Sequence, residues 1–310
     1  MTKKVYREPF LSYLDQIALL KSRGLSFEDE TQALNLLESV SYYRLSNYWH
    51  PLLKDKQNKT FKENASFDKV FELYKFDADL RRIIMSEIEK IEVAVRSKMA
   101  YILSLSNDSF WLENEGLFSD SEMYASIMSN IKEEVNRSHE SFIVSFRKEY
   151  SNDIPPAFMV LETMSFGTLS RLYKFLKLDK YKQEIAQFFG LSDVIFESWL
   201  HSMVYVRNIC AHHARLWNRQ MRIRPLPPKS LKNQWLNNRQ IANNRIYFIL
   251  SMVIYLLNII NPKHSFKQKL DALFLKYSSI DKTAMGFPIN WQEEPLWGGT
   301  FFYIPSHGHI

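Results

Sequence analysis

Apolar side chains recur at helical spacing over a long stretch in the first third of the chain, and this pattern limits the fold more than any other. Ser66 is suited to cap the start of this helix, because its hydroxyl can accept a backbone N–H of the first turn. The apolar positions that follow share one helical face as far as about Leu105. They are Val70, Leu73, Leu80, Ile84, Ile88, Ile91 and Val95. The sequence therefore predicts one long helix here.

Helix signals also dominate before this stretch. A first helix, over residues 11–23, should stop at Gly24. Ser26 should cap a second helix with acidic residues in its first turn, where carboxylates suit the helix dipole. A third helix is expected over residues 42–53, and the polar residues 54–64 are interpreted as a loop.

More helices are predicted in the second half of the chain, and no alternating strand pattern competes with them. Helices are expected between residues 119 and 150, and after Pro155 and Pro156, where Gly167 should break the helix before residues 169–176. Residues 222–228 contain three Pro and should form an extended arm. A long helix over residues 240–260 should end at Pro262, followed by a shorter one.

With only 8 Gly in 310 residues, an all-α fold is the prediction. We expect a single domain in three parts. These are N-terminal helices in residues 1–60, a helical core at about 66–262, and a C-terminal helix and tail in 263–310.

The sequence favours a cytoplasmic protein without a membrane segment. A single cysteine, Cys210, cannot form an intramolecular disulfide and fits a reducing compartment. The first ten residues carry charge with no apolar stretch behind them, so no signal peptide is expected. The most apolar stretch, residues 246–260, is shorter than the roughly 20 apolar residues that span a bilayer, so a buried core helix is expected there.

Basic residues are unevenly distributed along the chain. Residues 198–270 contain twelve Lys and Arg and no Asp or Glu, so this segment carries +12 while the whole chain carries +6. A solvated surface normally mixes both signs, so the segregation indicates a polyanionic partner such as nucleic acid, with a merely basic face as the alternative. The candidate contact residues are Arg215, Arg219, Arg222, Arg224, Lys229, Lys232 and Arg239.

Ser192 should open a helix with two different stripes. One stripe is apolar (Trp199, Met203, Val206, Cys210) and should face the core, which makes Cys210 a packed residue rather than a nucleophile. The other stripe is polar and could simply line a satisfied polar interface. It consists of His201, Tyr205, Asn208 and His212.

Cations beside the polar stripe favour a phosphodiester site over a plain interface. Arg207 lies next to the stripe, and Asn208 shares a face with His212, so its amide could orient the imidazole. His213 follows Cys210 at i+3 and is expected to lean toward the core. Arg44 and His50 have a similar spacing, but we interpret residues 42–49 as packing.

Residues 207–219, RNICAHHARLWNR, resemble the Abi-like proteins of bacterial abortive infection (AbiD/AbiF type). Residues 42–49, 76–81 and 285–291 agree with the same family. The family is similar to the HEPN superfamily, whose signature is Arg, a polar residue, three residues and His. Here these are Arg207, Asn208 and His212.

The resemblance implies a HEPN-like helical bundle with an N-terminal helical extension, which dimerises and cleaves RNA without a metal or other cofactor. It also implies phage defence or a toxin-like role, with a structured noncoding RNA as a possible partner. His212 would act as general acid or base, Arg207 would neutralise charge on the phosphate, and Asn208 would orient His212 or the phosphate. His201, Tyr205 and His213 are possible accessory residues.

Two alternatives remain open. The first is a non-catalytic RNA-binding protein, in which the motif only binds RNA or structures the dimer. The second, less favoured, is a metal nuclease. The motif helix has no carboxylate from Ser198 onward, whereas a Mg²⁺ site needs carboxylate oxygens.

Overall fold

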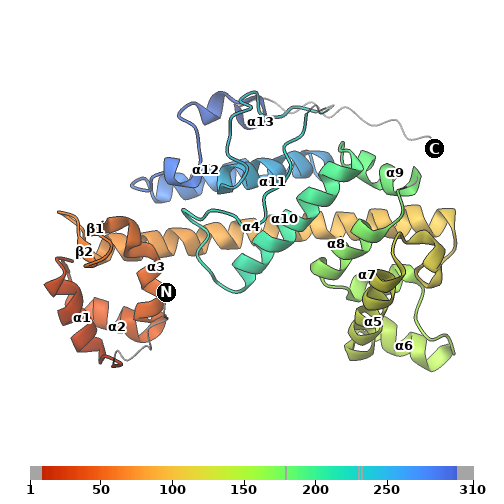
Figure 1. The fold of residues 1–310 in the computed structure, drawn as a ribbon, viewed down its shortest axis with the longest axis horizontal. Helices are drawn as coiled ribbons and strands as arrows, with labels where there is room; N and C mark the ends of the chain where they lie inside the picture. The colour runs from red at the N-terminus through yellow and green to blue at the C-terminus, as the bar shows by residue number, and fades with distance from the viewer. Residues whose placement is uncertain (1–8, 179, 230, 232, 299–310) are drawn as a thin grey trace, which may run out of the picture. The chain divides into compact units, whose positions relative to one another are not determined.

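The computed structural model describes residues 9–178, 180–229, 231 and 233–298 (Figure 1). These residues are mostly helical, which confirms the all-α prediction. They form two compact units. The first contains the described residues up to Leu80 together with Leu273–Ile280, and the second contains Arg81–Ala272 and the described residues from Asp281 onward. The domain boundaries proposed from the sequence stay a prediction.

The first unit is built from short helices and one small hairpin. Its elements are α1 (Tyr13–Ser22), α2 (Glu30–Val40), α3 (Tyr42–Trp49), the 3₁₀ turn η1 (His50–Leu52), β1 (Leu53–Asp55), β2 (Thr60–Phe61) and the start of α4 (Phe67–Ser106). The predicted stop after α1 is confirmed, because α1 ends at Ser22 and Gly24 has φ +92°, a left-handed conformation that Gly adopts readily.

The predicted cap of the second helix is wrong. Asp29, not Ser26, caps α2, and its Oδ1 accepts the backbone N–H groups of Thr31 and Gln32 at 2.8 and 3.0 Å. Ser26 instead lies in an isolated bridge with Ser66, and its N–H donates to the carbonyl of Ala65 at 3.1 Å. A carboxylate that reaches two amides stabilises the helix start better than a hydroxyl that lies further upstream.

The predicted loop at residues 54–64 contains a β-hairpin. Leu53 of β1 pairs with Phe61 of β2, and both side chains are buried. Asp55 fixes the connection by accepting the N–H groups of Gln57 and Asn58, and these hydrogen bonds lower the pKa of Asp55. Strands this short are too brief to show an alternating pattern, so the polar composition alone suggested a loop.

The long helix is confirmed as α4. Ser66 accepts the N–H of Lys69 at 3.2 Å at its start, and the helix continues to Ser106. The predicted apolar stripe is buried along it, and Ile84, Ile88 and Ile91 are fully covered in the second unit. The helical spacing of the sequence was therefore sufficient to predict this element.

The remaining helices belong to the second unit, apart from the last residues of α12. They are α5 (Ser121–Arg137), α6 (Ser141–Glu149), α7 (Ala157–Thr163), α8 (Phe166–Phe175), α9 (Lys180–Phe188), α10 (Asp193–Ala211), α11 (Ile246–Ile260), α12 (Phe266–Lys276) and α13 (Pro295–Gly298). The 3₁₀ turns are η2 (Trp111–Glu113), η3 (Glu115–Leu117), η4 (Thr283–Met285) and η5 (Trp291–Glu293).

Two predicted boundaries in this unit are wrong. The break between α7 and α8 lies at Met164 and Ser165, and Gly167 is inside the first turn of α8, because Ser165 caps that helix by accepting the N–H of Thr168 at 3.1 Å. The predicted helix over residues 240–260 begins only at Ile246. Every residue of α11 except Ile260 is buried, so it is a core helix as expected. No helix among the described residues is long and apolar enough to cross a membrane.

Arg96 of α4 joins this helix to the end of α7. Its guanidinium is buried, pairs with Glu92 and donates hydrogen bonds to the carbonyls of Leu161 and Met164. The last carbonyls of a helix lack the full set of donors inside the helix. A buried guanidinium that donates to them therefore stabilises both α4 and the end of α7.

Arg96→Ala should lower the free energy of unfolding by about 3 kcal/mol, because it leaves Glu92 and the carbonyl of Met164 without their donor in a buried site. Urea denaturation followed by circular dichroism measures this loss. The matched control is Arg137→Ala, which breaks another i,i+4 pair with Glu133 whose side chains are 68% and 64% exposed. The control should cost at most about 0.5 kcal/mol, and equal losses in the two variants would contradict the role of Arg96.

Candidate functional site

Helix α10 carries the motif and is held by its apolar stripe. Ser192 caps the helix, as predicted, and α10 packs on α8, α9 and α11 (Figure 1). The predicted core stripe is confirmed, since Trp199, Met203 and Val206 are completely buried and Cys210 is 5% exposed. Packing on this side fixes which face of α10 is left for other contacts.

The polar stripe lies mainly on the open side of α10. His201, Asn208 and His212 are exposed. Tyr205 is half-buried, and its hydroxyl is covered without a hydrogen-bond partner. Within this described chain the stripe therefore does not form a satisfied polar interface.

The end of α10 determines where the two histidines point. His212 is the C-cap of α10, and its backbone N–H donates to the carbonyl of Asn208 at 3.0 Å. His213 adopts φ +54° and donates its N–H to Cys210, while Ala214 donates its N–H to Ile209, both at 3.0 Å. This pair of bonds is the Schellman arrangement that ends helices, usually with Gly at the left-handed position.

The prediction that His213 leans toward the core is wrong. Its side chain is exposed, because the helix has ended before it and the i+3 spacing no longer applies. Arg81 of α4 also supports the turn by donating to the carbonyl of Ala214 at 3.4 Å. The turn leaves both His212 and His213 open to solvent.

Arg207 and Asn208 contact each other directly. The guanidinium Nη1 of the half-buried Arg207 lies 3.4 Å from the amide Oδ1 of Asn208. Among the described side chains, Asn208 and His212 share a face but form no hydrogen bond with each other. In the structure the amide of Asn208 therefore contacts Arg207 and not the imidazole of His212.

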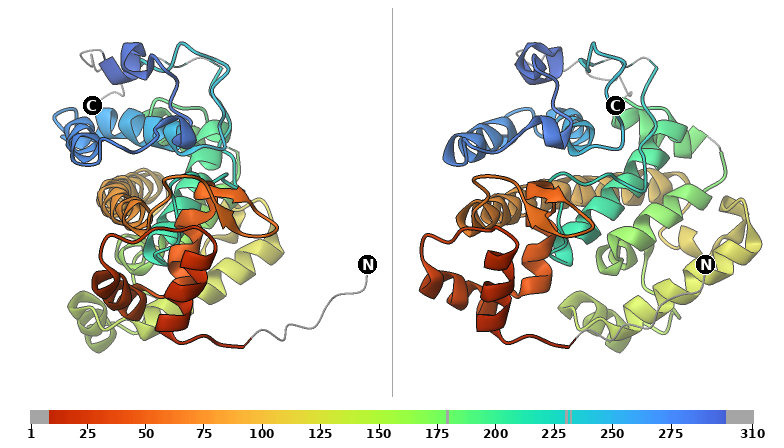
Figure 2. Two further views of the ribbon diagram at one scale, coloured as in Figure 1. Left: turned by 90° about the vertical axis from the view of Figure 1, so that its left-hand side faces the viewer. Right: turned by 60° about the vertical axis from the view of Figure 1, so that its left-hand side comes forward.

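Residues 214–228, which we call the arm, run back along α10 (Figure 2). The N–H of Leu226 donates to the hydroxyl of Ser198 at 2.8 Å, and the indole of Trp199 donates to the carbonyl of Leu226 at 2.9 Å. Asn243 adds a bond to the carbonyl of Pro225 at 3.0 Å. Residues 222–228 are not helical, as predicted from the prolines, and sequence reasoning missed the residues that fix their path.

The arm and the residues after it carry exposed cations. Arg222, Arg224, Lys229 and Arg239 are exposed, whereas Arg215 and Arg219 are half-buried. Arg219 and Arg239 each donate to a carbonyl, of Arg215 and Pro228 respectively, both at 3.1 Å. Lys232, also a candidate, lies outside the described residues.

Other described basic residues of the segment serve the fold instead. Arg245 donates to Asn218 at 2.9 Å and to the carbonyl of Ala284, and Lys267 donates to the carbonyl of Trp297. Lys269 pairs with the buried Glu87 at 2.6 Å. Of these three residues, Lys269 is paired with an opposite charge, while Arg245 and Lys267 bond to neutral oxygens.

His264 provides a structural contrast to His212. Its Nδ1 accepts the N–H of Phe266 at 3.1 Å, and its Nε2 lies 2.8 Å from Asn258. Burial lowers the pKa of His264 and so favours the neutral ring. This histidine supports the start of α12, whereas His212 makes no such contact among the described residues and is open to solvent.

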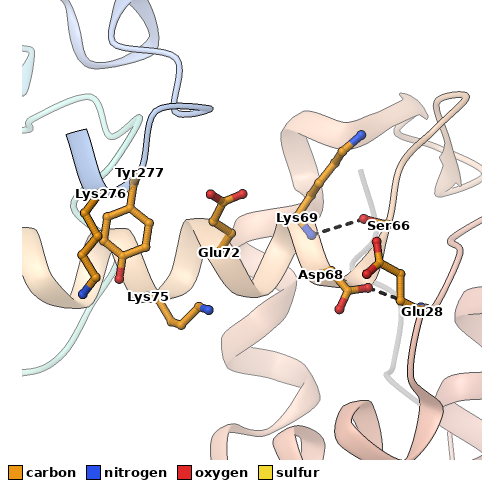
Figure 3. A pocket seen from close by; sticks show the side chains of 8 residues that line it. All are labelled: Glu28, Ser66, Asp68, Lys69, Glu72, Lys75, Lys276 and Tyr277. Atoms are coloured by element: carbon orange, nitrogen blue, oxygen red, sulfur yellow. Dashed lines mark hydrogen bonds between the residues drawn. The ribbon is translucent and has the colours of Figure 1, made fainter. Parts of the chain in front are cut away.

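A hollow in the first unit has mixed charge (Figure 3). Glu28, Asp68 and Glu72 line it together with lysines, and Asp68 accepts the N–H of Glu28 at 3.4 Å. Because carboxylates and lysines line this hollow together, its charge favours binding of neither an anion nor a cation. Among the described residues, no group of His, Cys, Asp or Glu is arranged to hold a metal ion.

A protein-family model described as "Abi-like protein" matches residues 35–218. The match includes all of α10 and ends within the arm, just before Arg219. No curated protein and no solved structure shows significant similarity to the chain.

Proposed function

The chain belongs to the Abi-like protein family, and we propose that it is an RNA-binding, metal-independent endoribonuclease of an abortive-infection or toxin-like system. The observation that carries the proposal is the end of α10. There, Arg207, Asn208 and His212 lie beside a basic arm, with His212 and Asn208 exposed. A cation, an amide and a titratable ring together can hold and cut a phosphodiester.

The reaction uses the nucleophile that RNA itself supplies. His212 takes the proton of the 2′-OH, the 2′ oxygen attacks phosphorus, and the bond to the 5′ oxygen breaks. The proton needed by the leaving oxygen comes from a protonated imidazole. Arg207 neutralises charge that grows on the phosphate oxygens, and Asn208 holds its guanidinium by the 3.4 Å contact.

A homodimer would supply both the base and the acid, since each chain has one His212 of this kind. The exposed face of α10, with His201, Asn208 and His212, is the surface through which two copies would meet. Light scattering at micromolar concentration should give twice the 36.8 kDa mass of the chain. A monomer, with and without RNA, would refute the two-chain site.

Membership of the Abi-like family supports a cellular role in abortive infection. Cutting RNA in an infected cell would stop phage growth, and a structured noncoding RNA bound to the arm would restrain or direct the nuclease.

A second candidate function is RNA binding without cleavage. The contact of Asn208 with Arg207, rather than with the imidazole, favours this reading of the motif.

His212→Ala should abolish cleavage while RNA affinity and folding remain, because acid–base groups typically contribute about 10² to 10⁴ in rate. His139→Ala is the control, since His139 is also exposed but lies between α5 and α6. The measurement is the cleavage rate of a broad RNA pool beside its binding affinity. Tight binding by the wild-type protein with no cleavage anywhere in the pool would favour the binding-only function.

Replacing Arg219, Arg222 and Arg224 with Gln should weaken RNA binding and flatten its dependence on salt. Each lost phosphate contact should reduce the slope of log K against log salt by about 0.7 to 0.9. The control removes the same charge from α5 and α6 by changing Lys132, Arg137 and Lys148 to Gln, all exposed. Equal slopes in the two triple variants would exclude the arm from the RNA interface.

A further inference from the structure

A second cavity, of about 750 Å³, lies in the first unit between α1, α3 and the β1–β2 hairpin. Its size is within the range of small-molecule sites in proteins. The hairpin is tied to the end of α1 by the N–H of Phe61, which donates to the carbonyl of Arg23 at 2.9 Å. The sequence led us to interpret residues 42–49 as packing, but part of that segment lines this cavity.

Aromatic rings form much of the wall. Trp49 is buried and meets the ring of Tyr42 edge to face, with centroids 4.8 Å apart. Phe10 and Tyr43 also line the cavity, although they are 92% and 84% exposed. Large rings left open at the rim of a cavity can stack on a flat ligand.

The cavity has cations but no carboxylate among its described lining residues. Arg23 lies in the wall and donates to the hydroxyl of Tyr42 at 3.2 Å. Lys56 and Lys59 come from the turn of the hairpin, where both are exposed. The carboxylate oxygens of the nearby Asp55 accept hydrogen bonds from the amides of the same turn. Lys56 and Lys59 therefore remain available to an anion.

A buried acceptor in the wall has no partner. Gln16 is 6% exposed, and its amide nitrogen donates to the carbonyl of Leu11 at 2.9 Å, which fixes the orientation of the amide. Its Oε1 is therefore an acceptor, and it has no hydrogen-bond partner in the structure. Oε1 is closed to water in this conformation, so a ligand that donates to it must shift part of the wall, and it then relieves an unpaired buried acceptor.

From these features we propose that the cavity binds a nucleotide. The base stacks on the aromatic rim, a base N–H donates to Oε1 of Gln16, and the phosphate meets Arg23, Lys56 and Lys59. The nucleotide is either free or the end of an RNA chain. The proposal does not depend on cleavage, because every residue that it uses lies in the first unit and none belongs to α10.

Isothermal titration of the full chain with the four nucleoside 5′-monophosphates tests the proposal, with ribose 5-phosphate as a probe that lacks a base. At least one nucleotide should bind, and ribose 5-phosphate should bind much more weakly. A 5′-phosphorylated RNA oligonucleotide that binds more tightly than any free nucleotide, and competes with it, identifies an RNA end as the ligand. The reverse order identifies the free nucleotide.

Three variants separate the parts of the site. Tyr43→Ala should weaken nucleotide binding about five- to hundred-fold through lost stacking, and Gln16→Leu should weaken it by removing the acceptor. Lys56→Gln with Lys59→Gln should weaken binding of the nucleotide but not of the nucleoside. The controls are Tyr101→Ala, an exposed ring on α4, and Lys54→Gln, a lysine of β1 that does not line the cavity.

Binding should be unchanged in His212→Ala, so a failed cleavage assay leaves this test intact. Equal binding of ribose 5-phosphate and all nucleotides would reduce the site to a plain anion site and overturn the proposal. Absence of binding by every probe, or full affinity in Tyr43→Ala and Gln16→Leu, would overturn it as well.

Discussion

The burial of Trp199 organises the second unit around its candidate site. Its ring is fully covered and packs edge to face on Tyr255 of α11 at 5.6 Å and against Trp235 at 5.2 Å. The same indole donates to the carbonyl of Leu226 and so holds the arm. One side chain thus fixes the inward face of α10, its contact with the core helix and the path of the basic residues. Aromatic burial of this extent dominates core energetics.

The turn after α10 sets the chemistry that its last residues can perform. Because α10 ends at Ala211, His212 is its C-cap and His213 is the first residue beyond the helix. The left-handed backbone of His213 costs an L-residue about 1–2 kcal/mol, which Gly would avoid. The two exposed histidines and the half-buried Arg207 therefore lie at the C-terminal end of α10, where the basic arm begins.

Patterns that span many residues were predictable from the sequence. The α4 stripe and the α10 core stripe repeat over several turns, so their burial followed from spacing alone, and the prolines predicted the absence of helix in residues 222–228. Local competition was not predictable. Asp29 caps α2 in place of Ser26, and Ser165, not Gly167, marks the break before α8. Leu53 pairs with Phe61 in strands that are too short to show an alternating pattern.

The candidate site shows the same division. Spacing placed Asn208 and His212 on one face, but the contact of Asn208 with Arg207 and the outward turn of His213 depend on how the helix ends. The count of charged residues revealed the basic segment, but it did not reveal that Lys269 shares the buried Glu87 with Lys90. The orphan oxygen of Gln16 had no sequence signal at all, because it depends on a bond that its own amide makes with Leu11.

The ends left on cleaved RNA decide whether the 2′-OH is the attacking group and whether the cleavage is independent of metal. In the presence of EDTA, the protein should still cut RNA and leave a 2′,3′-cyclic phosphate, or its hydrolysis product, and a 5′-OH. A substrate with one 2′-deoxyribose at the scissile position should resist cutting there, because the attacking oxygen is missing. Mass spectrometry of the products reads all of these outcomes. Cleavage that stops in EDTA and leaves a 5′-phosphate, or that proceeds at the deoxy position, would contradict the account.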